Sequence, residues 1–552
     1  MSEIWHAGYG DGDWGSALRA LTLLFPLSGV GASTPSAISR PPRSTCDAEG
    51  RDGTMNRIED FKREKDGLDV LPEIERYSRE GPDSISERDK ALMKWYGVFF
   101  RKHTPGFFMM RIRITNGIAT AQQVHTLAEI TQELGAGFAD ITTRQQVQLR
   151  SVRIDGIPAV FAQLEAVGLT SLQTGMDNVR NVIGCPVAGL TPRELFDASP
   201  AAREFTRLFV GSRAYTNLPR KFNVAITGCP ENCVGAESQD VAMVPARKGE
   251  RVGLNVLVGG KMGSGGYRRA DPLDVFVEPA AAAEVAAAIV RVFRDQGPRE
   301  ARNRSRFAFL VDDWGVARVR AAVEEACGRS LEPAGEDARG PNRTDHVGIY
   351  RQKDGRSFVG VVVPGGRVTA VQLAEVARLA ETYGSGEVRF TTEQNLIIPN
   401  ISDPGLRELT QEPLLKELPY NPPEILRGFV VCTGIDFCDL ALIDTKARAL
   451  PMTRALAARL ADRKEPLRMH WSGCPAGCGN HQLADIGFEG TKVRVNNKVV
   501  EAVDVWVGGR SGPEPRPGQR IMENVPLSDL PEVLEYLARF FPKQRVARAR
   551  TQ

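Results

Sequence analysis

Four cysteines near the carboxyl-terminal end of the sequence are grouped like metal ligands. The chain reads VCTGIDFCDL and later WSGCPAGCGNHQ, which places the thiols at Cys432, Cys438, Cys474 and Cys478. Four thiolates are what a [4Fe–4S] cluster needs. Zinc ribbons also use four cysteines, but they favour C-x2-C pairs, and here the pairs are C-x5-C and C-x3-C. We therefore expect a [4Fe–4S] cluster, with zinc or buried free thiols as the alternatives.

A second group of residues is basic. It consists of Arg111 in MMRIRIT, Arg144 in TTRQ, Arg180 in MDNVRN and Lys221 in LPRKFN. Arginine forms paired hydrogen bonds with carboxylates, and lysine supplies a point charge. If the fold brings these cations together, they would suit a tetrapyrrole that carries carboxylates, a small oxyanion, or both.

The positioning elements occur twice in the chain. At one constant spacing, ITNGIATAQQVHTLAEI (114–130) matches VPGGRVTAVQLAEVARL (363–379), TTRQQVQL (142–149) matches TTEQNLII (391–398), and LNVLVGG (254–260) matches VDVWVGG (503–509). TGCPENC (227–233) matches SGCPAGC (472–478) at a slightly different spacing. A constant spacing interrupted by one small insertion is hard to obtain by chance, so the chain is an internal duplication.

Each copy predicts a strand, a glycine turn, a helix and a second strand. Thr120 with Gln123, and Thr369 with Gln372, form T-x-x-Q capping boxes at the helix starts. The first helix shows one apolar face, made by Val124, Leu127, Ile130 and Leu134. We expect TTRQ and TTEQ on the second strands. The two β-α-β pieces are expected to pair into one pseudo-twofold sheet, and each copy continues into a longer α/β module.

The two copies differ in their cysteines. We match CTGIDFC with QTGMDNV, which puts Gln173 and Val179 where the second half has thiols. On this match the first half cannot hold a second four-thiolate cluster. Beyond the extension, we interpret the other four thiols as small, buried, apolar-like residues, namely Cys185, Cys229, Cys233 and Cys327.

The expected organisation follows from these patterns. It comprises 1–54, an extension; 55–100, a helical segment; 101–170, the first β-α-β piece; 171–330, the first module with the basic residues; 331–345, a linker; 346–415, the second β-α-β piece; and 416–552, the second module with the cysteine cluster. The extension is rich in Gly, Ser and Pro, so we expect it to be disordered or to reflect a start at Met55. We interpret GGKMGSGG (259–266) as a turn at a module edge.

Composition excludes several classes of protein. The 552 residues carry a formal net charge of +3, which does not suit a surface built for nucleic acid. No apolar run approaches the roughly 20 residues of a membrane helix. Nine cysteines are too few for a disulfide scaffold of this length. Because the first residues lack the short basic start of an export signal, we expect a cytoplasmic protein. We also expect a monomer, without nucleic-acid or membrane partners.

The joint set of motifs resembles the sirohaem nitrite and sulfite reductase family. These motifs are CTGIDFC with SGCPAGCGN, TSLQTGMDNVRN, LPRKFN, FMMRIRITNG and ADITTRQ, and the resemblance covers about residues 90–510. It implies an α/β fold with two ferredoxin-like half-domains in pseudo-twofold pairing plus two α/β modules. It also implies sirohaem coupled to the [4Fe–4S] cluster, with Cys478 bridging to the sirohaem iron. Arg111, Arg144, Arg180 and Lys221 would then hold sirohaem and substrate.

The resemblance leaves a choice of substrate. Flavoprotein-partnered sulfite reductases resemble RKFK, whereas this chain has Asn223 two residues after Lys221. Gly175 stands where other sulfite reductases have a cysteine. We expect assimilatory six-electron reduction of nitrite to ammonia, with Arg111, Arg180, Lys221 and Asn223 as catalytic residues.

Other assignments remain possible from the sequence. No flavin or nicotinamide module is visible, so electrons would come from a separate protein, ferredoxin, whose docking patch the sequence does not place. The alternatives are a ferredoxin-dependent sulfite reductase, a non-catalytic iron–sulfur redox protein and a cobalamin-pathway enzyme of related fold.

Overall fold

The computed structural model describes residues 56–540, except for 264–265, 341–342 and 512–514. The predicted extension, residues 1–54, lies outside these ranges. The first described elements are helical, as expected: α2 (Arg57–Glu64), α3 (Leu71–Glu80) and α4 (Glu87–Leu92). None of the helices in the described ranges combines the length and apolar character that a bilayer-crossing helix requires.

The two β-α-β pieces form two five-stranded sheets that exchange a strand. The first sheet has the order β1-β2-β5-β4-β14 and the second has the order β12-β13-β16-β15-β3. Their elements are β1 (Val98–Phe100), β2 (Phe107–Ile112), β3 (Ile118–Thr120), β4 (Phe138–Ile141), β5 (Val147–Arg153), β12 (Gly348–Arg351), β13 (Ser357–Val361), β14 (Arg367–Thr369), β15 (Glu387–Phe390) and β16 (Leu396–Ile401). The expectation of one shared sheet was therefore wrong, because each half donates one short strand to the sheet of the other.

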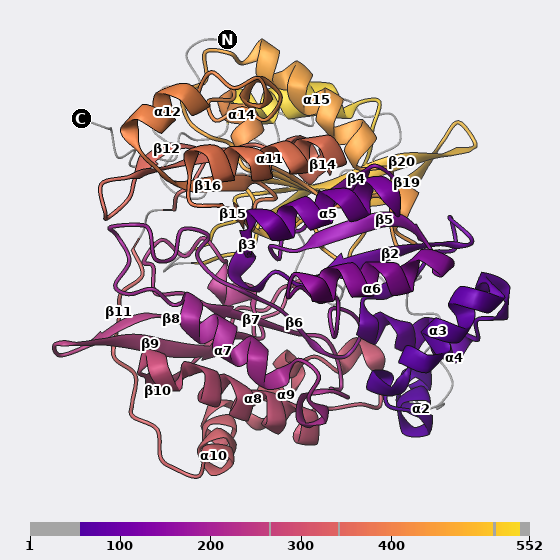
Figure 1. Cartoon of the computed structure of the whole chain (residues 1–552), viewed down its shortest axis with the longest axis vertical. Coiled ribbons are helices and arrows are strands. Elements are labelled where there is room, and N and C mark those ends of the chain that lie inside the picture. The colour runs from indigo at the N-terminus through magenta and orange to yellow at the C-terminus, as the bar shows by residue number, and fades with distance from the viewer. Residues whose placement is uncertain (1–55, 264–265, 341–342, 512–514, 541–552) are drawn as a thin grey trace.

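Helices cover these sheets and share one core. They are α5 (Ala121–Glu133), α6 (Ile157–Ala166), α11 (Ala370–Tyr383), α12 (Asp403–Leu409) and α13 (Leu414–Glu417). Both capping boxes are present, at the starts of α5 and α11. The apolar face of α5 is buried, and α5 packs against α11 near the centre of the molecule (Figure 1). The two half-domains thus bury a single hydrophobic core.

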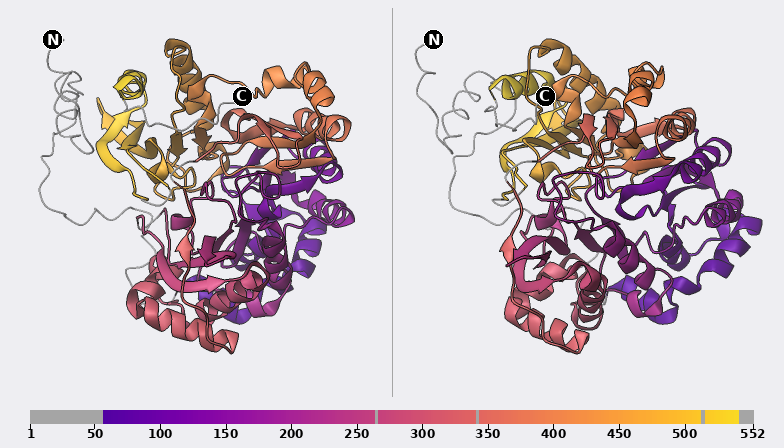
Figure 2. Two further views of the ribbon diagram at one scale, coloured as in Figure 1. Left: turned by 90° about the vertical axis from the view of Figure 1, so that its left-hand side faces the viewer. Right: turned by 60° about the vertical axis from the view of Figure 1, so that its left-hand side comes forward.

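The two modules share one strand plan. Module 1 has the order β10-β9-β8-β7-β6, with β11 paired to β8, and module 2 has the order β17-β18-β19-β20-β21. In each, three parallel strands are followed by antiparallel ones. The modules lie at opposite ends of the long axis, module 1 in the lower part and module 2 in the upper part of Figures 1 and 2.

The elements of module 1 are β6 (Val179–Ile183), β7 (Phe222–Ile226), β8 (Val241–Lys248), β9 (Arg251–Val258), β10 (Asp271–Val277), β11 (Glu336–Asp337), α7 (Ser199–Phe209), α8 (Ala282–Gln296), α9 (Phe307–Trp314) and α10 (Val316–Cys327). Those of module 2 are β17 (Phe429–Val431), β18 (Met469–Ser472), β19 (Ile486–Val495), β20 (Lys498–Val507), β21 (Gln519–Pro526), α14 (Glu424–Arg427), α15 (Lys446–Arg459) and α16 (Leu530–Phe540). Each module has its own core.

The TTRQ and TTEQ motifs lie in turns, not on strands as expected. TTRQ joins β4 to β5, and TTEQ joins β15 to β16. Gln145 and Gln394 have φ values of 56° and 65°, which is the left-handed region that a tight turn requires. The Gln145 amide donates to the carbonyl of Phe390 at 3.0 Å, and the Gln394 amide donates to that of Ile141 at 2.9 Å. Each turn therefore holds the backbone of the opposite half.

Strand pairing gives a different match between the two copies of the cysteine motif. Ile183 of β6 pairs with Ala225 of β7, and Val430 of β17 pairs with His470 of β18. Ala225 and His470 lie at the same distance before the C-x3-C motifs of their modules. Ile183 therefore occupies the place of Val430.

This register corrects the predicted match of CTGIDFC with residues 173–179. Cys185 follows Ile183 at the distance at which Cys432 follows Val430, so Cys185 is the counterpart of Cys432. The counterpart of Cys438 is Thr191. The two segments share the pattern T-G-x-D but occupy different places in their modules. QTGMDNV ends at the first residue of β6, whereas CTGIDFC begins directly after β17.

Candidate active site and cofactor recess

The four cysteines of module 2 gather at one edge of its sheet. Cys432 follows β17, and Cys474 and Cys478 follow β18. These strands are parallel neighbours, so their carboxyl ends open at the same edge. A one-turn 3-10 helix at Ile435–Phe437 carries the chain from Cys432 to Cys438. The backbone N–H of Gly473 donates to the Cys432 sulfur at 3.1 Å.

The spacing of these thiols suits a cluster. Burial raises the pKa of the Cys474 thiol, and the charges of Cys478, Cys438 and Cys432 raise it further. One group of His, Cys, Asp or Glu side chains in the described ranges has all its ligand atoms within 4.8 Å, and these cysteines are not that group. No three of the four thiols are therefore as close as that group, and four thiols are the number that a cubane of iron and sulfide requires.

Cys478 connects the cysteine site to the first half-domain. Its thiol is exposed, whereas that of Cys474 is buried. The hydroxyl of Thr143, in the TTRQ turn, donates to the Cys478 carbonyl at 3.2 Å. The cysteine loop and the turn that carries Arg144 therefore meet.

A recess opens where they meet. Cys478, Arg144, Lys221 and Asn223 line it, together with Thr143, Ser238, Gln239, Met262, Ala476, Gly477 and Asn480. Lys221 lies directly before β7 and Asn223 lies on it. The structure thus brings three of the predicted polar residues to the same space as the exposed thiol. The Asn223 side-chain oxygen is buried there without a hydrogen-bond partner.

Arg111 and Arg180 form a second pair of cations beside this recess. Arg111 lies on β2 and Arg180 on β6. Both guanidiniums donate to the carbonyl oxygen of Thr174, at 3.2 Å from Arg111 and 2.7 Å from Arg180. Burial and the nearby charge of Arg144 lower the pKa of Arg111 to about 9. Burial, Arg111 and Arg144 lower the pKa of Arg180 well below its ordinary value.

The positive charge of this region is not balanced within the described ranges. No ion pair joins Arg111, Arg144, Arg180 or Lys221 to a carboxylate of the described residues, although neighbouring Arg306 is paired with Asp240 at 2.7 Å. The Nε atoms of the three arginines are buried without hydrogen-bond partners. Burial, and then Arg306 and Arg144, lower the pKa of Lys221 well below its ordinary value. Unpaired buried cations are costly, so the site fits an anionic group that would complete it.

The glycine-rich loop interpreted as a peripheral turn contributes to this site. Met262 lines the recess, and a Cβ on Gly263 would lie 2.4 Å from the carbonyl of Ala476 in the cysteine loop. Gly477 has a φ of 68° and faces Gly263. The two glycines allow the backbones of the two modules to touch beside Cys478. Met262 and Thr143 were not among the predicted site residues, although the repetition of Thr143 as Thr392 is a signal in the sequence that marks the latter.

Comparisons with known proteins agree with this arrangement. A family model described as the nitrite and sulphite reductase 4Fe-4S domain matches residues 175–331 and 425–552. A model described as the nitrite/sulfite reductase ferredoxin-like half domain matches residues 100–167 and 350–415. The half-domains and modules therefore alternate along the chain as the duplication predicts.

Individual relatives extend over most of the chain. A ferredoxin–nitrite reductase of Synechococcus elongatus is 44% identical over 492 residues, which cover 88% of this chain and 96% of that protein. An assimilatory ferredoxin-dependent nitrite reductase of Haloferax mediterranei is 39% identical, over 89% of this chain and 90% of that protein. The NirA protein of Mycobacterium tuberculosis has a structure that matches with a TM-score of 0.84 and 32% identity, over 90% of this chain and 95% of that one. The chain therefore belongs to the nitrite and sulphite reductase family.

Proposed function

We propose that the protein is an assimilatory nitrite reductase that uses sirohaem and a [4Fe–4S] cluster to reduce nitrite to ammonia by six electrons. The observation that carries this proposal is the meeting of Cys478 with unpaired cations in one recess. An exposed thiol of a four-cysteine site lies beside Arg144 and Lys221, and no described carboxylate pairs with either cation. The relatives are named as ferredoxin-dependent nitrite reductases, which supports nitrite as the substrate and ferredoxin as the electron donor.

The cofactors would be held by residues from both halves. Cys432, Cys438, Cys474 and Cys478 would bind the cluster, and Cys478 lines the recess that would hold the sirohaem. Arg111, Arg144, Arg180 and Lys221 would neutralise the sirohaem carboxylates and the bound anion by charge-assisted hydrogen bonds. When bound, the sirohaem and the cluster supply the electron transfer that amino-acid side chains do not provide.

The protein's own contribution to the reaction is electrostatic. The Thr174 carbonyl fixes the guanidiniums of Arg111 and Arg180 before any substrate arrives. Preorganised cations of this kind stabilise negative charge on the oxygens of an anion without a reorganisation cost. Lys221 and Asn223 approach from β7, so one charged donor and one neutral donor reach the same recess. A singly charged anion such as nitrite fits this set of donors.

Two further assignments accompany the proposal. A soluble ferredoxin would deliver electrons singly, by transient docking that charge complementarity guides. We propose a monomer that works in the cytoplasm, where the free cysteines of the described chain remain reduced.

The absorption spectrum of the purified protein tests the cofactor assignment. We expect a Soret band and a red band typical of an isobacteriochlorin, together with iron and acid-labile sulfide. Arg144→Leu should lower sirohaem content while the cluster iron remains, because Arg144 borders the recess but is not a cluster ligand. Arg207→Leu is the matched control, since Arg207 is exposed and, among the described residues, pairs with Glu204 alone. Protein without the isobacteriochlorin bands, from cells that make sirohaem, would contradict the proposal.

A further inference from the structure

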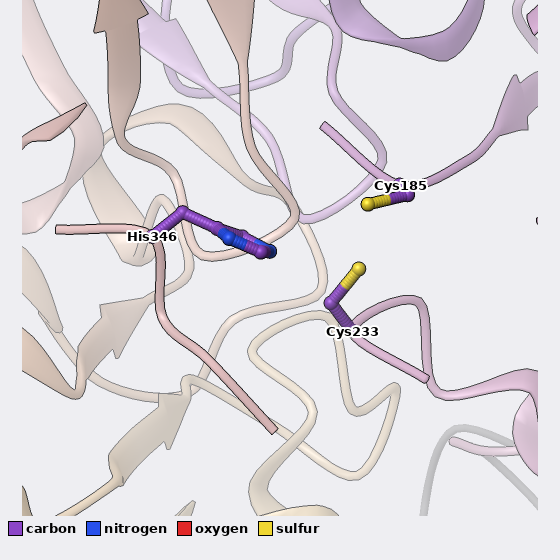
Figure 3. Close-up of side chains that lie close together, drawn as sticks. All are labelled: Cys185, Cys233 and His346. Atoms are coloured by element: carbon purple, nitrogen blue, oxygen red, sulfur yellow. The ribbon is translucent and has the colours of Figure 1, made fainter. Parts of the chain in front are cut away.

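A second group of metal-ligating side chains lies in module 1, away from the recess. The ligand atoms of Cys185, Cys233 and His346 all lie within 4.8 Å of one another, and all three side chains are buried. Figure 3 shows the two sulfurs and the imidazole pointing toward one another. Cys185 follows β6, Cys233 lies in the loop after β7, and His346 comes shortly before β12 of the second half. Within the described ranges this is the one group with such close spacing.

Three cysteines of this region occupy the places of cluster ligands in module 2. Cys185 corresponds to Cys432, by the strand register, and Cys229 and Cys233 correspond to Cys474 and Cys478, by the repeated C-x3-C motif. The backbone confirms the match. The N–H of Leu195 donates to the Gly228 carbonyl at 2.9 Å, and the N–H of Leu442 donates to the Gly473 carbonyl at 2.8 Å.

The half-domains hold both loops in the same way. Thr143 donates to the Cys478 carbonyl, and its counterpart Thr392 donates to the Cys233 carbonyl at 2.9 Å. Arg389 adds bonds to the carbonyls of Pro186 and Ala188, at 3.1 and 2.6 Å, which fix the loop directly after Cys185. The thiol positions in module 1 are therefore set by the second half-domain.

The chemistry of the two sites differs at the fourth ligand. Thr191 replaces the fourth thiol, so a four-thiolate cluster has no complete ligand set here. His346 takes a place among the thiols instead, and its Nε2 is buried without a hydrogen-bond partner. Gly360 allows this approach, because a Cβ there would lie 1.7 Å from the His346 carbonyl. Cys229 belongs to the same buried cluster as Cys185 and Cys233, but it lies outside the close group that these two thiols form with His346.

We propose that Cys185, Cys233 and His346 bind one Zn²⁺ ion, and that the thiol of Cys229, which lies outside this close group in the structure, moves in to complete the ligand set. Three thiolates and one imidazole form an established ligand set for structural zinc, with tetrahedral geometry and no redox change. The close spacing of Cys185, Cys233 and His346 favours a single ion, whereas no three cysteines of module 2 lie as close together. Because His346 belongs to the second half, the ion would join module 1 to half-domain 2. Metal binding of this kind contributes directly to folding free energy.

Metal analysis of the holoenzyme, purified from cells supplied with zinc, tests this site. We expect one zinc ion per chain in addition to iron. X-ray absorption at the zinc edge should show sulfur ligands at about 2.3 Å and a nitrogen ligand at about 2.0–2.1 Å. Because this measurement is specific for zinc, the iron of the other cofactors does not interfere. The wild-type protein is therefore sufficient to show whether zinc is bound and by which kinds of ligand.

Variants connect the zinc to these residues. Cys185→Ser and His346→Gln should each lose the zinc and keep the iron and the sirohaem bands, whereas His346→Cys should retain the zinc through a fourth thiolate. Cys327→Ser and His125→Gln are the matched controls, since Cys327 ends α10 and His125 is an exposed partner of Glu381. Wild-type protein without zinc, a disulfide between Cys185 and Cys233, or zinc that survives both ligand variants would overturn the proposal.

Discussion

Arg111 and Arg180 share one acceptor, the carbonyl oxygen of Thr174, although they come from different domains of the chain. Arg111 lies on a strand of the first half-domain and Arg180 on a strand of module 1. Like charges that meet at one acceptor repel each other, and here burial adds to that cost. The arrangement is therefore poised for an anion, which would relieve the repulsion.

Loss of one of these guanidiniums should impair turnover more than cofactor binding. We expect Arg180→Gln to lower kcat for nitrite by about 100-fold or more, because removal of one preorganised donor typically has this effect. Cluster iron should remain and the sirohaem bands should fall far less than kcat, which separates this result from misfolding. Arg207→Gln, on the exposed face of α7, should leave kcat unchanged. Equal turnover in Arg180→Gln and the wild type would exclude Arg180 from the reaction.

The cysteine assignment predicts an asymmetric result. Serine at Cys432, Cys438, Cys474 or Cys478 should remove iron, acid-labile sulfide and most of the sirohaem absorption, because a hydroxyl is a poor ligand for iron in such clusters. Serine at Cys229 should leave iron and sulfide in place, since Cys229 lies in module 1. Iron and labile sulfide assays on matched preparations check both statements. Loss of cluster iron from Cys229→Ser would show that the two cysteine groups are not independent.

Asn223 should control the choice between nitrite and sulfite. It lines the recess with Lys221 and adds no charge. A lysine there would place a positive charge near the bound anion, worth about 4 kcal/mol at about 4 Å and an effective dielectric of about 20, before desolvation. A third of that energy is roughly tenfold in affinity. We expect Asn223→Lys to raise sulfite turnover relative to nitrite, measured as the ratio of the two kcat/KM values. Asn421→Lys, at an exposed position that does not line the recess, is a control for added charge elsewhere. A ratio that does not change would remove Asn223 from the specificity determinants.

Features that depend on neighbouring residues were predicted correctly from the sequence, whereas contacts between distant segments were not. The capping boxes at Thr120 and Thr369 depend on residues three positions apart, so the sequence alone predicts them. The exchange of β3 and β14 depends on pairing between distant segments, which no local pattern reports. Pairing between distant segments also explains why Gln173 was wrongly predicted as the counterpart of Cys432. Only the strand register shows that Cys185, after β6, stands in its place. His346, at the start of the second β-α-β piece, carried no signal, because a lone histidine reveals its neighbours only after folding.

The strand exchange has a buried electrostatic component that can be measured. Asp140 of β4 forms ion pairs with Arg150, with Arg367 of the exchanged strand β14 and with Lys446. Burial alone would raise the pKa of Asp140, but the charges of Lys446, Arg150 and Arg367 hold it far below its usual range. A carboxyl with a depressed pKa stabilises the fold at all pH values above its unfolded pKa and loses this effect only as the pH falls toward its folded pKa.

We therefore expect Asp140→Asn to lower the free energy of unfolding by about 3–5 kcal/mol, because it leaves three cations without their counter-ion. The difference should stay constant around neutral pH, where the carboxylate is fully ionised. Asp155→Asn is the control, since its exposed pair with Arg153 should be worth less than about 1 kcal/mol. Urea unfolding of the three proteins measures both values, and equal midpoints for Asp140→Asn and the wild type would contradict the account of the exchange.

The most direct test of the central claim is the product formed from nitrite by the purified wild-type protein with a chemically reduced dye as electron donor. Ammonium and sulfide are measured in parallel reactions with nitrite and with sulfite. The account predicts one ammonium for each nitrite consumed, at a rate far above that of sulfide formation from sulfite. Preference for sulfite would contradict the assignment as a nitrite reductase, and consumption of nitrite without ammonium would contradict the six-electron reaction.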